Sequence, residues 1–132
     1  MEDMISTFQI IFTTIGGYIG WVVGGIDGFI YALIMFVVID YITGVMVSVL
    51  DKRVSSDIGF RGIFRKVLIF AMIAIGNVID DYLIKDGNTI RTAIVFFYIS
   101  NEGISILENS SKIGLPIPEK LKAILKEINK DN

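Results

Sequence analysis

The sequence predicts an all-α fold: an integral membrane helical bundle of four transmembrane helices followed by a C-terminal amphipathic helix. Hydrophobic residues make up 53% of the 132 residues, and the mean hydropathy is +0.67. A soluble domain of this length buries only part of its apolar surface, so this composition favours a membrane. Four apolar stretches alternate with short polar segments, and about 20 apolar residues suffice to cross a bilayer. We expect residues 1–132 to form one domain.

The first apolar stretch, residues 5–25, contains no charged residue. Gly16, Gly20 and Gly24 recur in it every four residues, which places them on one face of a helix. A smooth glycine face lets a second helix approach closely in lipid, so these positions are candidates for helix–helix packing. The alternative is that they reflect only the general glycine enrichment of membrane segments.

The second apolar stretch, residues 28–50, has Asp40 near its middle. Gly44 and Ser48 follow on the same side at spacings of four, as further candidates for helix packing. A carboxylate at this depth costs roughly 2.5–3.5 kcal/mol on insertion scales. We therefore expect Asp40 to be protonated, paired, or directed at water or protein.

Residues 51–66 interrupt the apolar pattern and are predicted to form a loop, because serines and glycines recur there. The segment holds five basic residues and two aspartates, which fits a set of anchors at the cytoplasmic membrane surface. The five candidates are Lys52, Arg53, Arg61, Arg65 and Lys66.

The third and fourth apolar stretches, residues 63–83 and 89–109, each contain polar residues. Asn77 lies within the third stretch. In the fourth, polar residues follow one another at spacings of four, three and four, which is one helix face. These residues are Tyr98, Glu102, Ser105 and Asn109. A polar face on an apolar helix requires a partner or an aqueous space.

The tail, residues 116–132, is predicted to be a cytoplasmic amphipathic helix rather than a fifth span. Two prolines, Pro116 and Pro118, end the preceding helix. The apolar side of the tail would consist of Leu121, Ile124, Leu125 and Ile128. Its lysines either anchor it at the membrane surface or form an ordinary solvated face.

The distribution of charge predicts the topology. Residues 51–66 and 112–130 hold five Lys or Arg each, whereas residues 80–91 hold two, with three aspartates. By the positive-inside rule both basic segments and the C-terminus are cytoplasmic. If the first stretch spans, the N-terminus is also inside and there are four spans, which we expect. If it lies along the outer surface, there are three.

This topology also predicts a polar layer. Asp40, Asn77 and Glu102 would lie within about one helical turn of a common depth, in the inner half of the bilayer. In one interpretation they hydrogen-bond to each other, with a carboxyl group protonated, and lock the bundle. In the other, Asp40 or Glu102 lines water in an assembled oligomer.

Four motifs carry a resemblance to a known family. They are DYITG (40–44), SSDIGFRGIFRK (55–66), FFYISNEGISILEN (96–109) and GLPIPEKL (114–121). In order and spacing they resemble the phage holin family of the toxin-secretion and phage-lysis type (family 4), from about residue 21 to about residue 125. The resemblance implies a phage or prophage protein that accumulates in the bacterial cytoplasmic membrane. There it would assemble into lesions that release an endolysin or a toxin and cause host-cell lysis.

The composition argues against other functions. The chain lacks cysteine and histidine, so we expect no catalytic residue, no metal site and no cofactor. A net charge of −2 gives no reason to expect nucleic-acid binding. The alternatives are a small channel or transporter component, although no inverted repeat is visible, and an antiholin that delays lysis. Because three or four helices pack without a hole, a protein-sized lesion must be a homo-oligomer.

Overall fold

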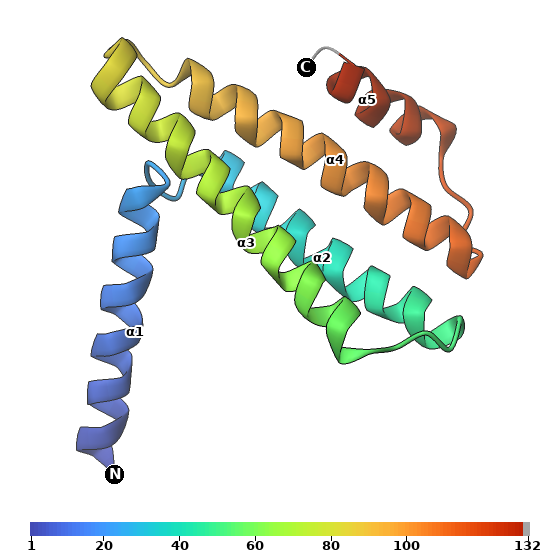
Figure 1. Cartoon of the computed structure of the whole chain (residues 1–132), viewed down its shortest axis with the longest axis horizontal. Coiled ribbons are helices and arrows are strands. Elements are labelled where there is room, and N and C mark those ends of the chain that lie inside the picture. Colours follow the sequence, from blue (N-terminus) through green and yellow to red (C-terminus); the bar gives the residue numbers. More distant parts are fainter. Residues whose placement is uncertain (131–132) are drawn as a thin grey trace.

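A computed structural model describes residues 1–130 of the chain, without the side chains of residues 125 and 128–130 (Figure 1). Leu125 and Ile128 of the expected tail face therefore lie outside the described side chains. The predicted all-α fold is confirmed. Its elements are α1 (Glu2–Val22), α2 (Gly28–Leu50), α3 (Ser56–Val78), a π-helical segment η1 (Ile79–Ile84), α4 (Thr89–Ile113) and α5 (Glu119–Lys130).

Four helices are long and apolar enough to cross a membrane: α1, α2, α3 continued by η1, and α4. Three of them form the bundle, in which α4 packs most extensively against α2 and then against α3. Its core consists of Val23, Ile30, Leu33, Val37, Ile69, Ile73 and Val95. Gly76 permits the approach of α3 to α4, since a Cβ atom there would lie 3.2 Å from Arg91 Cα.

Helix α1 points away from the bundle, and only its C-terminal end lies close to it (Figure 1). Gly20 is its one buried residue, so nearly every apolar side chain of α1 is exposed. The chain reverses between α1 and α2 at Gly24 and Gly25, whose φ angles are +90° and +101°. Such angles are strained for residues that carry a Cβ atom, which explains glycine at both positions.

The predicted loop over residues 51–66 is wrong beyond residue 55, because α3 begins at Ser56. The Ser55 hydroxyl accepts a hydrogen bond from the Ile58 N–H at 3.2 Å, which caps the helix. Gly59 and Gly62 do not break the helix. They provide room for Tyr41, whose hydroxyl would lie 3.5 Å from a Cβ atom at Gly59 and whose ring would lie 3.3 Å from one at Gly62.

The tail helix α5 folds back along α4 and packs against it (Figure 1). Helix α4 ends at Ile113, before the two prolines, and Gly114 takes a φ of +106° to terminate it. The hairpin arrangement brings the 51–55 turn and the C-terminal end of α4 to one end of the bundle (Figure 1). Both basic segments therefore begin at the same end.

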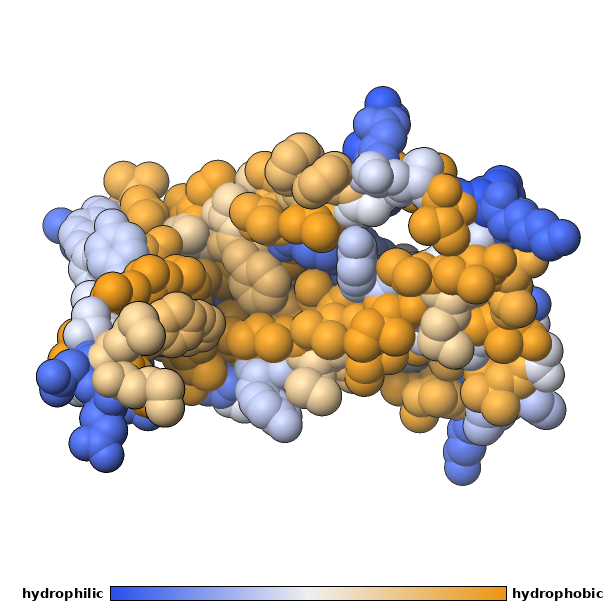
Figure 2. Space-filling view, turned by 90° about the horizontal axis from the view of Figure 1, so that it is seen from below, coloured by the Kyte–Doolittle hydropathy of each residue, from blue (hydrophilic) through white to orange (hydrophobic). Residues whose placement is uncertain are grey.

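The surface seen from below is mostly apolar across its middle, with hydrophilic residues toward its ends and edges (Figure 2). Many large hydrophobic side chains of α2 and α3 are exposed, among them Tyr31, Ile42, Phe64 and Leu68. An apolar belt of this kind is what lipid tails cover in a membrane protein.

Candidate functional site

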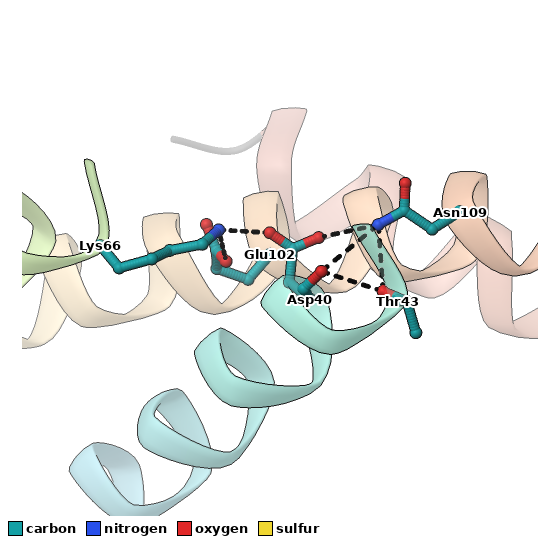
Figure 3. A network of polar contacts seen from close by, with 5 residues as sticks. All are labelled: Asp40, Thr43, Lys66, Glu102 and Asn109. Carbon is teal, nitrogen blue, oxygen red and sulfur yellow. Dashed lines mark hydrogen bonds and ion pairs between the residues drawn. The ribbon is translucent and has the colours of Figure 1, made fainter. Parts of the chain in front are cut away.

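One lysine joins the three bundle helices in their interior (Figure 3). Lys66 of α3 donates hydrogen bonds to the carboxylates of Asp40 on α2 and Glu102 on α4, the latter at 2.5 Å. The Lys66 side chain is 15% exposed and each carboxylate side chain 8%. We call these three residues the inner ion cluster.

Asn109 extends the inner ion cluster along α4. Its side-chain amide donates to Asp40 Oδ1 at 3.3 Å and to the Thr43 hydroxyl at 3.0 Å. The Thr43 hydroxyl donates in turn to the Asp40 carbonyl at 3.0 Å. The polar face predicted on α4 is therefore directed at α2 and α3.

The inner ion cluster contains two carboxyl groups and one ammonium group. With all three ionised its net charge is −1, and binding one proton neutralises it. Buried charges are tolerated only when paired and hydrogen-bonded, and both carboxylates meet that condition through Lys66. Of the alternatives expected for Asp40, the structure shows the pairing.

The expectation that Lys66 is a surface anchor is wrong. Because α3 begins at Ser56, Lys66 lies ten residues inside the helix, about 15 Å from its start. The other four basic residues of this segment are exposed. Arg53 pairs with Asp51 at 2.8 Å and Arg61 with Asp57 at 3.6 Å.

Asn77 does not belong to the same polar layer, contrary to the prediction. It follows Lys66 by eleven residues on the same helix, a separation of about 16 Å. Its side-chain amide donates instead to the Val22 carbonyl at the end of α1, at 3.4 Å. Asp40 and Glu102 lie at one level of the bundle, since both accept hydrogen bonds from Lys66.

A second polar cluster, which sequence reasoning missed, lies at the opposite end of the bundle around Arg91. The guanidinium donates to the Val23 carbonyl at 2.6 Å, the Gly25 carbonyl at 2.9 Å and the Asp27 carboxylate at 3.0 Å. Arg91 is only 3% exposed. We call Arg91, Asp27 and Asp80 the outer cluster.

Asp80 caps α4 from the preceding helix. It is 1% exposed, and its carboxylate accepts the backbone N–H groups of Ile90 at 3.1 Å and Arg91 at 2.8 Å. The available signal in the sequence was a single arginine at the start of an apolar helix, with aspartates ending the helix before it.

Asp27 combines two tasks at the start of α2. Burial acts to raise the pKa of its carboxyl group, but the Ile30 N–H and the Arg91 guanidinium outweigh burial and hold the pKa below its ordinary value. The carboxylate therefore stays ionised at neutral pH, caps α2 and pairs with Arg91.

The three glycines predicted as one packing face have different surroundings. Gly24 lies in the turn after α1, where a Cβ atom would lie 2.5 Å from Asn77 Oδ1 and 2.7 Å from Arg91 Nε. Glycine at position 24 therefore lets the turn backbone lie close to Arg91 of the outer cluster. A Cβ at Gly20 would meet Ile26 at 3.2 Å, whereas Gly16 has nothing within 4 Å.

A groove of about 480 Å³ opens at the basic end, between α2, α3 and α4. It leads inward to Asp40 and Lys66. Polar residues on its walls include Ser48, Ser55, Ser56, Arg65, Ser105 and Asn109. Gly44 also lines it, 3.8 Å from the Asn109 amide when a Cβ is added. Toward the opposite end the bundle is filled by the buried apolar core.

Comparison with known proteins identifies the family. The bacteriophage holin family matches residues 17–130. A probable holin of Bacillus phage phi105 is 42% identical over 96 residues, covering 72% of this chain and 70% of the phage protein. The chain belongs to the bacteriophage holin family. As the helices and the family both indicate, this holin-family protein is a multi-pass membrane protein.

Bacterial relatives of this holin-family protein cover most or nearly all of its length. An uncharacterized 14.9 kDa protein in the nagH 3′ region of Clostridium perfringens is 40% identical over 129 residues, 98% of each chain. The uncharacterized protein Lmo0128 of Listeria monocytogenes is 40% identical over 110 residues, 83% of this chain and 78% of the relative. No solved structure is significantly similar.

Proposed function

We propose that this holin assembles into homo-oligomeric lesions in the bacterial cytoplasmic membrane. Through these lesions an endolysin, or a secreted toxin, leaves the cytoplasm, and host-cell lysis follows. The supporting observation is the packing of the single bundle. Its core is filled by apolar side chains, and Lys66 pairs the two intramembrane carboxylates internally. A passage for a protein must therefore form between copies of the chain.

Helix α1 is the element best suited to join those copies. Beyond Glu2 and Asp3 in its first turn it carries no charged residue, and it diverges from its own bundle (Figure 1). A Cβ atom added at Gly16 would meet no side chain and no other element of the described chain within 4 Å. In lipid, where packing drives association, such a position favours contact with a second helix.

We further propose that the inner ion cluster locks the bundle rather than lining the lesion. Glu102→Leu tests this role, because it leaves Lys66 and Asp40 as a neutral pair. A locking role predicts that permeabilisation persists at normal protein levels. Loss of permeabilisation at normal protein levels would instead assign Glu102 to the water-lined surface of the assembly.

The proposed function is tested by inducible expression in a bacterium, with and without a co-expressed endolysin. We expect abrupt growth arrest from the chain and lysis only when the endolysin is present. Endolysin alone is the control. Survival with altered solute uptake would indicate a transporter component, and delayed killing by an active holin would indicate an antiholin.

Assembly is tested separately, by chemical crosslinking during the same time course. We expect crosslinked species larger than a dimer to accumulate before lysis, because subunits must gather before a lateral assembly forms. Only monomers at the time of lysis would contradict assembly.

A further inference from the structure

A second groove lies between α4 and α5, near the basic end of the bundle. Its volume is about 510 Å³. The floor and walls combine two apolar residues of α4 with polar residues of both helices. The lining residues are Ile104, Leu107, Glu108, Ser111, Lys112, Lys122 and Lys126.

The lining of this groove is cationic. Three lysines stand against one glutamate, which gives a net charge of 3 − 1 = +2. Outside this lining, Glu119 lies 3.8 Å from the Lys122 ammonium, and its side chain is 90% exposed. A solvent-exposed pair of this kind is weak, so Lys122 remains available to an anion.

The groove lies where a membrane surface is expected. Helix α4 has 25 residues, hence a length of about 37 Å, whereas the hydrocarbon core is about 30 Å thick. Ile104 lies about two and a half turns and Leu107 just under two turns before the end of α4, and Lys112 lies in its last turn. The wall therefore runs from the hydrocarbon to the headgroup region, and lysine side chains can extend toward water.

We propose that this groove binds an anionic phospholipid, with the phosphate among the three lysines and an acyl chain along Ile104 and Leu107. The apolar wall is what favours a lipid over a free anion, because inorganic phosphate gains nothing from it. The net charge of +2 favours an anionic headgroup over a zwitterionic one of similar size. Helix α5 thereby becomes a lipid-binding element that fixes the tail at the membrane surface.

The test is native mass spectrometry of the full chain in mild detergent, titrated with phosphatidylglycerol or phosphatidylcholine. We expect preferential binding of phosphatidylglycerol, and a loss of roughly fivefold in its affinity for each lysine removed. The variant K112Q/K122Q/K126Q should bind both lipids equally. The matched control K52Q/R53Q/R61Q removes three charges at the same end, outside the groove, and should retain the preference.

Two outcomes would overturn the proposal. Equal losses in both triple variants would mean that general surface charge, not the groove, attracts the lipid. Displacement of phosphatidylglycerol by equimolar inorganic phosphate would identify a simple anion site. Because this measurement needs no lesion, its failure leaves the proposed holin function untouched, and the lysis experiment above tests that function independently.

Discussion

Lys66 has an unusual position among the charged residues of this chain, since a single ammonium group serves two carboxylates on two other helices. Removing it would leave Asp40 and Glu102 facing one another with no counter-charge. Breaking a buried ion pair by removing one partner typically costs about 3–5 kcal/mol, because the remaining charge stays buried. The loss of stability caused by a substitution in the inner ion cluster therefore depends on which residue is replaced.

We expect Lys66→Met to lower the free energy of unfolding by about 3–5 kcal/mol, measured by denaturant unfolding in detergent micelles. The triple variant D40N/K66M/E102Q, which removes every charge of the cluster, should recover much of that loss. A Lys66→Met protein as stable as the wild type would contradict the role assigned to the ammonium group.

Gly24 and Gly25 form a matched pair at the α1–α2 turn. Both have positive φ angles, so alanine at either position costs about 1 kcal/mol in backbone strain. Only at Gly24 would the new Cβ also collide with Asn77 and Arg91, while at Gly25 nothing lies within 4 Å. We expect Gly24→Ala to destabilise the chain by about 1–3 kcal/mol more than Gly25→Ala. Equal thermal unfolding temperatures for the two variants would refute this.

At the scale of elements, apolar length and spacing were sufficient to predict the four helices that are long and apolar enough to cross a membrane, the tail helix and the polar face of α4, although not that this face is directed at α2 and α3. The start of α3 was wrong because one serine cap resembles a loop signal when glycines follow it. That single error also made two other predictions wrong. Lys66 was assigned to the surface, and Asn77 to the depth of Asp40.

The polar partners could not be predicted, because periodicity gives the face of a residue but not the helix opposite it. Lys66 reaches partners 26 and 36 residues away in sequence, and Arg91 reaches Asp27 across 64 residues. The Arg91 contacts to the Val23 and Gly25 carbonyls depend on a turn whose shape the sequence does not specify. Such contacts follow only from the arrangement of the elements.

Helix α1 yields a prediction about assembly. Gly16 and Gly17 both have nothing within 4 Å, yet they project about 100° apart around the helix. If the face of Gly16 contacts a second copy, Gly16→Ile should reduce crosslinked oligomers several-fold, while Gly17→Ile should not. Neither variant should change the stability of the bundle. Equal effects of both variants on crosslinking would rule out a specific glycine face.

At the scale of the whole molecule, the bundle has two electrically different ends. The basic segments meet at one end, whereas the outer cluster and the aspartates of η1 lie at the other. The positive-inside rule then orients the bundle with its basic end in the cytoplasm, as we propose. Helix α1 adjoins the bundle at the opposite end. The side of the membrane on which the N-terminus lies therefore depends on whether α1 crosses the membrane.

Because the chain contains no cysteine, single introduced cysteines can report this topology without background. We expect Glu2→Cys and Lys52→Cys to be labelled from the cytoplasmic side, and Asp86→Cys from outside, by a membrane-impermeant maleimide applied to intact cells or inverted vesicles. Lys52 and Asp86 lie in the turns at opposite ends of the bundle and calibrate the two sides. If Glu2→Cys is labelled together with Asp86→Cys, α1 does not span, the protein has three membrane helices, and the apolar surface of α1 lies on the outer face.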